Sequence, residues 1–414
     1  MTDARALLRS LFDAAVAAAT PSNCMSDWLP RRPAGDVVII GAGKAAASMA
    51  HELERHWSGP LQGAVIVPYG HGAACQYINV IEAAHPIPDD SSVAATAALL
   101  EQVSGLSEDN TVVCLLSGGG SSLLTLPLAG LSLRDKQQIT SQLLRSGASI
   151  YEINAVRKKL SGIKGGKLAA ACAPARVITL IISDVPGNDA SIVASGPTVA
   201  DTTTVDDALS ILSRYGIDVS DATIEAMRIG DVSEASRTEA DVRVLATSDD
   251  ALQAAAAKAI ELGITPYLLG DLNSDARALG EEHARLATEI ATGAGPVELP
   301  CVVLSGGETT VRVTGRGRGG RNGEYALSLA IALDGHPDVS ALACDTDGID
   351  GGGDNAGSFV FPDTLERAAT HSIDARQLQD NNDSYRFFEA TGDLIVTGPT
   401  RTNVNDFRAV LIGS

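Results

Sequence analysis

The 414-residue chain is poor in aromatic residues, which make up 4% of it, and it has only 31 basic side chains against 51 acidic ones. The resulting formal charge of −20 repels phosphate backbones and anionic lipid, so nucleic acid and membrane surfaces are not expected as partners. The apolar set reaches 45%, which is enough to build buried cores. The sequence therefore predicts a soluble globular protein of two or three domains.

Closely spaced cysteines are also missing, since none of the six cysteines forms a CxxC pair or a zinc-knuckle spacing. The N-terminus carries charges within an amphipathic pattern, whereas a signal peptide needs an uninterrupted apolar stretch. We therefore expect a cytoplasmic protein with reduced thiols. Lysine is scarce too, and five of the seven lysines lie in or beside glycine-rich segments, where a small anion could bind.

Short β-branched runs alternate with Ala- and Leu-rich helical stretches along the whole chain. Continuous apolar strands in this pattern are typical of mainly parallel α/β sheets that are covered on both faces. Such sheets bind ligands at the carboxyl ends of their strands, where the glycine-rich turns of this sequence lie. We expect strands at 37–40, 64–67, 112–116, 177–182, 242–246, 267–269, 301–304 and 341–344.

The polar stretch 218–240 is the best linker candidate. We therefore place a domain boundary between residues 235 and 236, which gives an N-terminal domain 1–235 and a C-terminal domain 236–414.

The segment Gly41-Ala-Gly-Lys-Ala-Ala46 directly follows an expected strand and opens an expected helix. Its Gly41, Gly43 and Ala46 fit the dinucleotide fingerprint G-x-G-x-x-A. The acidic residue that should hold the ribose about 20 positions later is absent. Lys44 instead adds an ammonium group that suits phosphate or carboxylate. The alternative is a simple tight turn with a surface lysine.

The segment Ser117-Gly-Gly-Gly-Ser-Ser122 lies inside an uncharged stretch and would interrupt any membrane helix there. It fits neither a Walker A sequence nor the G-x-S-x-G nucleophile elbow. A strand, a glycine turn and a following helix explain it best, and the consecutive amides could cradle an anion. A purely structural turn remains the alternative.

Five cations lie within residues 157–167, and they are Arg157, Lys158, Lys159, Lys164 and Lys167. A helix that begins at Asn154 would place Arg157 in its first turns, against the positive end of the helix dipole. An external anion would offset this repulsion. A solvated basic face is the alternative.

Two groups of aspartates could act as bases or magnesium ligands. Asp184 and Asp189 flank a turn after an expected strand, and a cluster of Asp345, Asp347 and Asp350 follows another. Aspartate is also common in turns for purely structural reasons.

Arg321 follows two glycines at an expected helix start, from which its guanidinium can reach an anion. The single RGG-like copy in an acidic chain does not indicate RNA binding.

Cationic anchors, amide-rich turns and aspartates occur here without a recognisable Cys or Ser nucleophile motif. Phosphoryl transfer needs this combination, because its catalysis is mostly positioning and charge neutralisation. The residues therefore predict a small-molecule kinase.

The chain also resembles a known family through motifs that follow one another over nearly its whole length. They are GAGKA, LLSGGGSSLL, NAVRKKLSGIKGGKLA, SDVPGNDASIVASGPT, LSGGET, GRGGRNGEYAL, DTDGIDG, NNDSY and TGPTRTNVND. In this order they resemble the glycerate 2-kinase family with a C-terminal MOFRL domain, whose members are labelled glycerate kinase or hydroxypyruvate reductase. The resemblance implies phosphorylation of D-glycerate to 2-phosphoglycerate with ATP and Mg²⁺. It also implies a Rossmann-like, mostly parallel N-terminal domain and a smaller α/β MOFRL domain, with the active site in the cleft between them.

Roles follow from the resemblance for individual positions. Lys44 and Arg321 are expected to grip the substrate carboxylate or the transferred phosphoryl group, with Ser122 and Asp347 also contacting substrate. Asp184 or Asp189 is expected to be the base or the metal ligand. The expected nucleotide-binding residues are Gly41, Gly43, Ser117, Gly118, Gly119, Gly120, Ser121 and Lys167.

Some positions depart from the family pattern, namely Asn188, Gly323 and Gly352-Gly353. They put in question metal coordination near Asp189 and substrate contacts near Arg321. NAD(P)H-dependent reduction of hydroxypyruvate is the alternative enzyme activity, and a non-catalytic sensor of sugar acids is the alternative from another class. A homodimer is left open.

Overall fold

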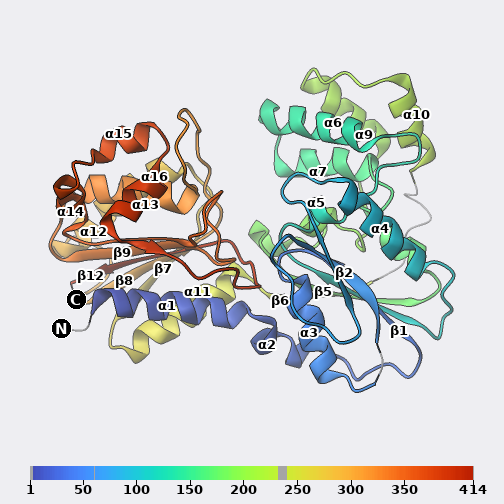
Figure 1. Cartoon of the computed structure of the whole chain (residues 1–414), viewed down its shortest axis with the longest axis horizontal. Coiled ribbons are helices and arrows are strands. Elements are labelled where there is room, and N and C mark those ends of the chain that lie inside the picture. Colours follow the sequence, from blue (N-terminus) through green and yellow to red (C-terminus); the bar gives the residue numbers. More distant parts are fainter. Residues whose placement is uncertain (1–2, 60, 232–239, 414) are drawn as a thin grey trace. The chain divides into compact units, whose positions relative to one another are not determined.

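The computed structural model describes residues 3–59, 61–231 and 240–413 (Figure 1). The chain divides into two compact units, of which one is Cys24–Leu245 and the other joins Met1–Asn23 to Ala246–Ser414. The expected boundary between residues 235 and 236 lies outside the described residues.

The N-terminal helix α1 (Ala4–Ala19) belongs to the second unit and not, as expected, to the unit that follows it in the chain. Its buried face includes Leu8, Leu11 and Phe12, and the Phe12 ring lies 6.0 Å from the ring of Phe407. Burial of this apolar stripe beside the second sheet explains the assignment.

The first unit is built on a six-stranded sheet in the order β3-β2-β1-β4-β5-β6. The pairings from β3 to β5 are all parallel, and the strand order reverses between β1 and β4. This reversal is the point at which open parallel sheets bind ligands. The strands are β1 (Val37–Ala42), β2 (Gln62–Pro68), β3 (Asn79–Ala83), β4 (Thr111–Leu116), β5 (Arg176–Ile182) and β6 (Asp241–Ala246).

The helices of this unit form two groups. One group packs around the sheet, where Val38, Ile40 and Val112 belong to the buried core. The other group has its own core, which includes Leu143, Val156 and Leu212, and it comprises α6, α7, α9 and α10 (Figure 1). The helices are α2 (Pro21–Cys24), α3 (Ala46–His56), α4 (Asp90–Val103), α5 (Gly120–Leu123), α6 (Leu133–Ser146), α7 (Ile150–Lys159), α8 (Lys167–Cys172), α9 (Val205–Arg214) and α10 (Asp221–Ile229).

The second unit has a mixed six-stranded sheet in the order β11-β10-β9-β12-β8-β7. Its C-terminal strand β12 lies between β8 and β9 and is antiparallel to both, so the parallel arrangement expected for most strands does not extend to this sheet. The strands are β7 (Thr265–Asp271), β8 (Cys301–Gly306), β9 (Val339–Asp345), β10 (Gly357–Val360), β11 (Leu394–Ile395) and β12 (Asp406–Ile412).

Helices cover both faces of the second sheet, with α1 and α11 on one face and α12, α13 and the short C-terminal helices on the other (Figure 1). They are α11 (Ser248–Glu261), α12 (Ala276–Ala291), α13 (Arg321–Leu333), α14 (Thr364–Thr370), α15 (Ala375–Asp380) and α16 (Ser384–Thr391). Both units are therefore α/β, as the sequence predicts. Among the described helices of the chain, none is long and apolar enough to cross a membrane.

Candidate active site

The glycine turn after β1 meets the glycine turn after β4 at the reversal point of the first sheet. The main-chain amide of Lys44 donates to the carbonyl of Gly118 at 2.8 Å, and that of Ala45 donates to Ser117 Oγ at 2.9 Å. The amides of Gly43 and Ala46 also donate to protein carbonyls. Binding a phosphate through these four amides would therefore break existing hydrogen bonds.

Gly43 has a φ of +136°, and a Cβ added there would lie 2.2 Å from Ser117 Oγ. The absence of a side chain thus lets the two turns pack together, and it does not leave an open nest for a pyrophosphate.

The turn after β4 is the better anion cradle of the two. As the sequence predicts, a strand, a glycine turn and a short helix follow each other at 111–123. The amides of Gly118 and Gly119 have no hydrogen-bond acceptor among the described residues. Gly119 adopts a φ of +80°, and a Cβ added there would lie 2.9 Å from His85 Nε2 and 3.6 Å from Lys44 Cγ. Lys44 and His85 therefore flank this turn.

Lys164 ties the turn to the SGPT segment. Its side chain is fully buried, and its Nζ donates to the carbonyl of Ser121 at 2.8 Å and to that of Ala194 at 3.1 Å. Ser121 Oγ lies 2.8 Å from Ser195 Oγ, which donates to Asn154 Oδ1 at 2.7 Å. This hydrogen-bond network fixes the turn 117–122 against the segment 194–195.

Ala194 and Ser195 both have left-handed backbones, with φ of +51° and +62°. This conformation is unfavourable for residues with a side chain and persists where the surroundings enforce it, often at functional sites.

The other cations of residues 157–167 have mostly structural partners. Lys158 and Lys159 pair with Asp201, and Lys159 also pairs with Asp231 at 3.0 Å. Lys167, an expected nucleotide ligand, donates to the carbonyl of Ser161 at 2.6 Å.

The expected helix start at Asn154 was wrong. Ser149 and Glu152 form a capping box, so α7 begins at Ile150 and Arg157 lies in its last turn. There the positive charges complement the helix dipole, and the proposed dipole repulsion does not exist.

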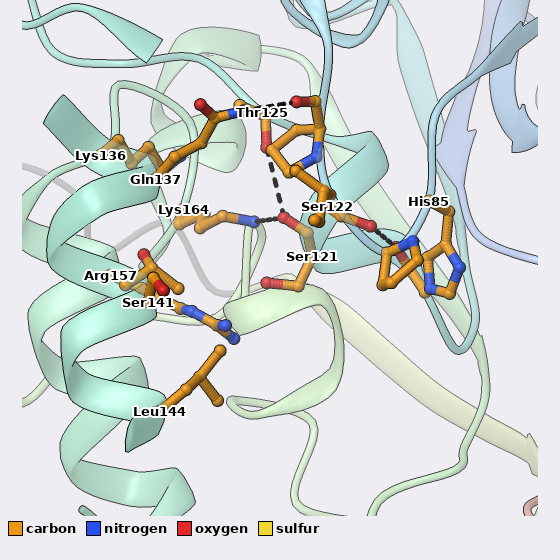
Figure 2. Close-up of a pocket in the computed structure, with 15 residues that line it drawn as sticks. His85, Ser121, Ser122, Thr125, Lys136, Gln137, Ser141, Leu144, Arg157 and Lys164 are labelled. Atoms are coloured by element: carbon orange, nitrogen blue, oxygen red, sulfur yellow. Dashed lines mark hydrogen bonds between the residues drawn. The ribbon is translucent and has the colours of Figure 1, made fainter. Parts of the chain in front are cut away.

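A cavity of about 460 Å³ lies beside the turn after β4 and within the first unit (Figure 2). Helix α6 contributes Lys136 and Leu144, helix α7 contributes Arg157, and His85 with the prolines after it closes another side. Figure 2 shows Lys136, Lys164 and Arg157 on one side, opposite Ser122 and His85. Three of the described lining residues are lysine or arginine, and none of them is aspartate or glutamate. The cavity is therefore suited to an anion.

The cations of the cavity have lowered pKa values. Burial, with the charges of Arg157 and Lys167 adding to it, lowers the pKa of Lys136 to about 7. Burial also lowers the pKa of Arg157 and puts that of Lys164 well below its usual range. These shifts have the direction expected when several positive groups share a site without counter-charges.

The two aspartates after β5 differ in their surroundings. Asp184 is half-buried, whereas Asp189 is exposed and its carboxylate accepts the amide of Ser191 at 2.9 Å. Asp189 thus forms an Asx turn, in agreement with the structural alternative. Asp184 is the less exposed of the two.

In the second unit, Arg321 begins helix α13 as predicted. Its guanidinium contacts Asp406 at 2.7 Å, Glu308 at 2.6 Å and Asp345 at 2.9 Å. Burial lowers the pKa of Arg321, but the three carboxylates outweigh burial and raise it. Its side chain remains 23% exposed, so the arginine is held in place by three carboxylates without being fully buried.

The aspartates of residues 345–350 share the supporting role. Asp350 accepts the main-chain amides of Asn322 at 3.0 Å and Gly323 at 2.8 Å, and so caps helix α13. Burial raises the pKa of Asp350 to about 6. Asp347, an expected substrate contact, is buried and accepts the amide of Ile349. No group of three His, Cys, Asp or Glu side chains within the described ranges has the arrangement of a metal site.

Lys136, Gln137 and His85 are not among the site residues that the sequence predicts. Lys136 lies in a helix rich in polar residues and away from glycine segments, so its local sequence resembles a solvated helix face. Its burial comes from packing between α6 and its neighbours, which no local pattern encodes.

The chain matches two family models, "Domain of unknown function (DUF4147)" over residues 7–228 and "MOFRL family" over residues 301–406. It is 39% identical to a D-glycerate 2-kinase of Thermotoga maritima over 96% of this chain and 95% of that protein. A protein of Agrobacterium vitis with the provisional name hydroxypyruvate reductase is 49% identical over 99% of this chain and 95% of its own. The crystal structure of a glycerate kinase from Thermotoga maritima superposes with a TM-score of 0.88 at 37% identity, covering 99% of each chain.

Proposed function

Because the chain belongs to the glycerate kinase family that combines a DUF4147 domain with a MOFRL domain, we propose that it phosphorylates D-glycerate with ATP. The products are 2-phosphoglycerate and ADP. The structural observation that supports this reaction best is the position of Lys44 beside the turn 117–122. Beside that turn, one cavity is lined by Gly119 and by the cations Lys136, Arg157 and Lys164, while the amides of the GAGK turn are already bonded within the protein.

The reaction is an in-line displacement. The C2 oxygen of glycerate bonds to the terminal phosphorus of ATP, the bond to the bridging oxygen breaks, and ADP leaves with that electron pair. The hydroxyl proton passes to a carboxylate oxygen of Asp184, which is half-buried at the carboxyl end of β5. We assign the phosphates to the turn 117–122, since its amides suit anions. Lys44 of the first unit and Arg321 of the second are each proposed as a cation that contacts an anionic group of the substrates.

Magnesium fits this site only in part. It usually takes one or two carboxylates and completes its coordination with substrate phosphates. Asp184 would hold the ion through the carboxylate oxygen that does not take the proton, since Asp189 is committed to its turn. When bound, the ion supplies charge neutralisation for the transferred phosphoryl group.

Reduction of hydroxypyruvate with NAD(P)H is the competing activity, and the name of the Agrobacterium relative favours it. The structure offers it little support. Strand β2 ends at Pro68 without a carboxylate for the ribose, and the glycine turn packs against Ser117.

Two assays run side by side separate these activities. ADP formation is followed with D-glycerate, ATP and Mg²⁺, and nicotinamide absorbance is followed with hydroxypyruvate and NADH or NADPH. We expect turnover only in the first assay. Turnover in the second assay with none in the first would overturn the proposal.

A further inference from the structure

The first unit contains buried lysines of two kinds. Lys158 and Lys159 are neutralised by Asp201 and Asp231. Lys136 is equally buried, with 6% of its surface exposed, yet its Nζ has no hydrogen-bond partner in the part of the chain that the structure describes. Among the described residues, no carboxylate lines the cavity that contains it. Within the described residues, Lys158 and Lys159 therefore have carboxylate counter-charges and Lys136 has none.

An unpaired buried ammonium group destabilises a ligand-free fold, because its hydration is lost without compensation. Methionine or leucine at position 136 would fill the same helix position of α6 without this cost. Arg157 adds a second buried cation from α7, and it has no ion pair among the described residues. A ligand that brings negative charge would offset both penalties.

The other lining residues and the volume of the cavity indicate which class of anionic ligand fits it. Ile87 and Leu144 line it and are 69% and 59% exposed, so two large apolar side chains of the lining are accessible to a ligand. A volume of about 460 Å³ lies in the range of drug-sized ligands, and a three-carbon acid would leave most of it empty. A ligand with a flat apolar part and several negative charges can contact both the apolar and the cationic side chains of the lining.

We propose that this cavity is the ATP-binding site, with Lys136 and Arg157 as phosphate-binding residues and Ile87 and Leu144 in contact with the base. The proposal rests on the proposed function in taking ATP as the phosphoryl donor. The phosphate chain then runs toward the unbonded amides of Gly118 and Gly119, beside which Lys44 lies.

Binding of this kind takes up protons. The cationic and titratable groups that face Lys136 are Arg157 from α7, Lys164 and Lys167 beyond it, and His85 from the loop after β3. The charges of Arg157, Lys164 and Lys167 disfavour a proton on Lys136 in the ligand-free protein. A triphosphate reverses this balance, so Lys136 becomes fully protonated as ATP binds.

The test measures ATP binding by calorimetry without glycerate, for the wild-type protein and for Lys136→Met. We expect at least a tenfold loss of affinity, with a melting temperature of the ligand-free variant equal to or above that of the wild type. Arg134→Met is the matched control, because Arg134 lies on the same helix and is exposed. Lys136→Arg should restore part of the affinity.

Two further measurements test the apolar part of the lining and the uptake of the proton. Leu144→Ser should weaken ATP binding while leaving the binding of inorganic triphosphate unchanged. Calorimetry near pH 8 in buffers of different ionisation enthalpy should show proton uptake by the wild type and less by Lys136→Met. If Lys136→Met does not fold, Arg157→Gln in the same binding assay decides.

The proposal is overturned if Lys136→Met binds ATP within twofold of the wild type, or if Leu144→Ser weakens triphosphate and ATP equally. Failure of the proposed function looks different. ATP binding that depends on Lys136, in a wild-type protein that does not phosphorylate glycerate, would retain the cavity assignment and refute the glycerate kinase activity.

Discussion

Ser117 Oγ accepts a hydrogen bond from the main-chain amide of Ala45 at 2.9 Å, and it lies where a side chain on Gly43 would be. The dinucleotide-like glycines of this chain therefore serve the packing of two turns. Because this contact is buried, Ser117→Ala should leave the amide of Ala45 unsatisfied and lower the free energy of unfolding by about 1–3 kcal/mol. Urea denaturation checks this value, and an unchanged midpoint would show that the hydrogen bond contributes nothing.

Lys44 should be needed for turnover and not for folding. Lys44→Met keeps the length and apolar part of the side chain and removes its charge, so we expect kcat/KM to fall by about 10²-fold or more through lost charge stabilisation. Circular dichroism and the melting temperature should stay close to those of the wild type. Normal turnover by this variant would show that Lys44 does not touch the reacting groups.

Arg321 should matter for both activity and stability. Arg321→Ala leaves the buried carboxylates of Asp345 and Asp406 without one of their counter-charges, which should destabilise the second unit by on the order of 3 kcal/mol. Arg321→Lys keeps the charge but cannot contact three carboxylates at once, so it should recover much of the stability and little of the activity. Activity of Arg321→Lys close to the wild type would contradict a role in substrate binding.

The two aspartates after β5 should respond differently to the same change. Asp184→Asn removes the proposed base and should lower kcat by about 10²-fold or more. Asp189→Asn retains an oxygen that can accept the amide of Ser191, so its kcat should stay within a few fold of the wild type. Steady-state kinetics of both variants decides this, and the reverse order would exchange their roles.

The stability of the ligand-free protein should rise with pH above neutrality. Because burial lowers the pKa of Lys136 to about 7, the unfolded chain binds more protons than the folded one between about pH 7 and pH 10. The free energy of unfolding must therefore increase over this range. Lys164 and Lys167 add to the rise in the same direction.

The difference between the wild type and Lys136→Met isolates the contribution of Lys136. The variant should show a shallower rise between pH 7 and pH 9 in denaturant titrations. Parallel curves would mean that Lys136 is protonated in the folded protein throughout this range.

Much of the fold can be predicted from the sequence because its strands are continuous apolar runs. The runs at 37–40, 112–116 and 177–182 are the cores of β1, β4 and β5. The predicted strands did not include β12, which follows a polar segment and pairs antiparallel with strands far away in the chain. Such pairing depends on long-range contacts that local periodicity does not encode.

The parts of the candidate site that depend on glycine turns and helix starts could be predicted from the sequence. The parts that depend on how helices pack could not. Glycines and a following helix marked the turn at 117–122 and the start of α13 at Arg321. The Ser149–Glu152 capping box was a readable signal for the start of α7, and it was overlooked in favour of Asn154. Lys136 had no such signal, because only the packing of α6 separates a buried lysine from an exposed one.

A phosphorus NMR spectrum of the product made from D-glycerate, ATP and Mg²⁺ tests the central claim most directly. We predict the resonances of ADP together with one new phosphomonoester signal that coincides with added 2-phosphoglycerate. A signal that coincides with 3-phosphoglycerate would contradict transfer to the C2 hydroxyl. Unchanged ATP in the presence of active, folded protein would contradict the kinase activity itself.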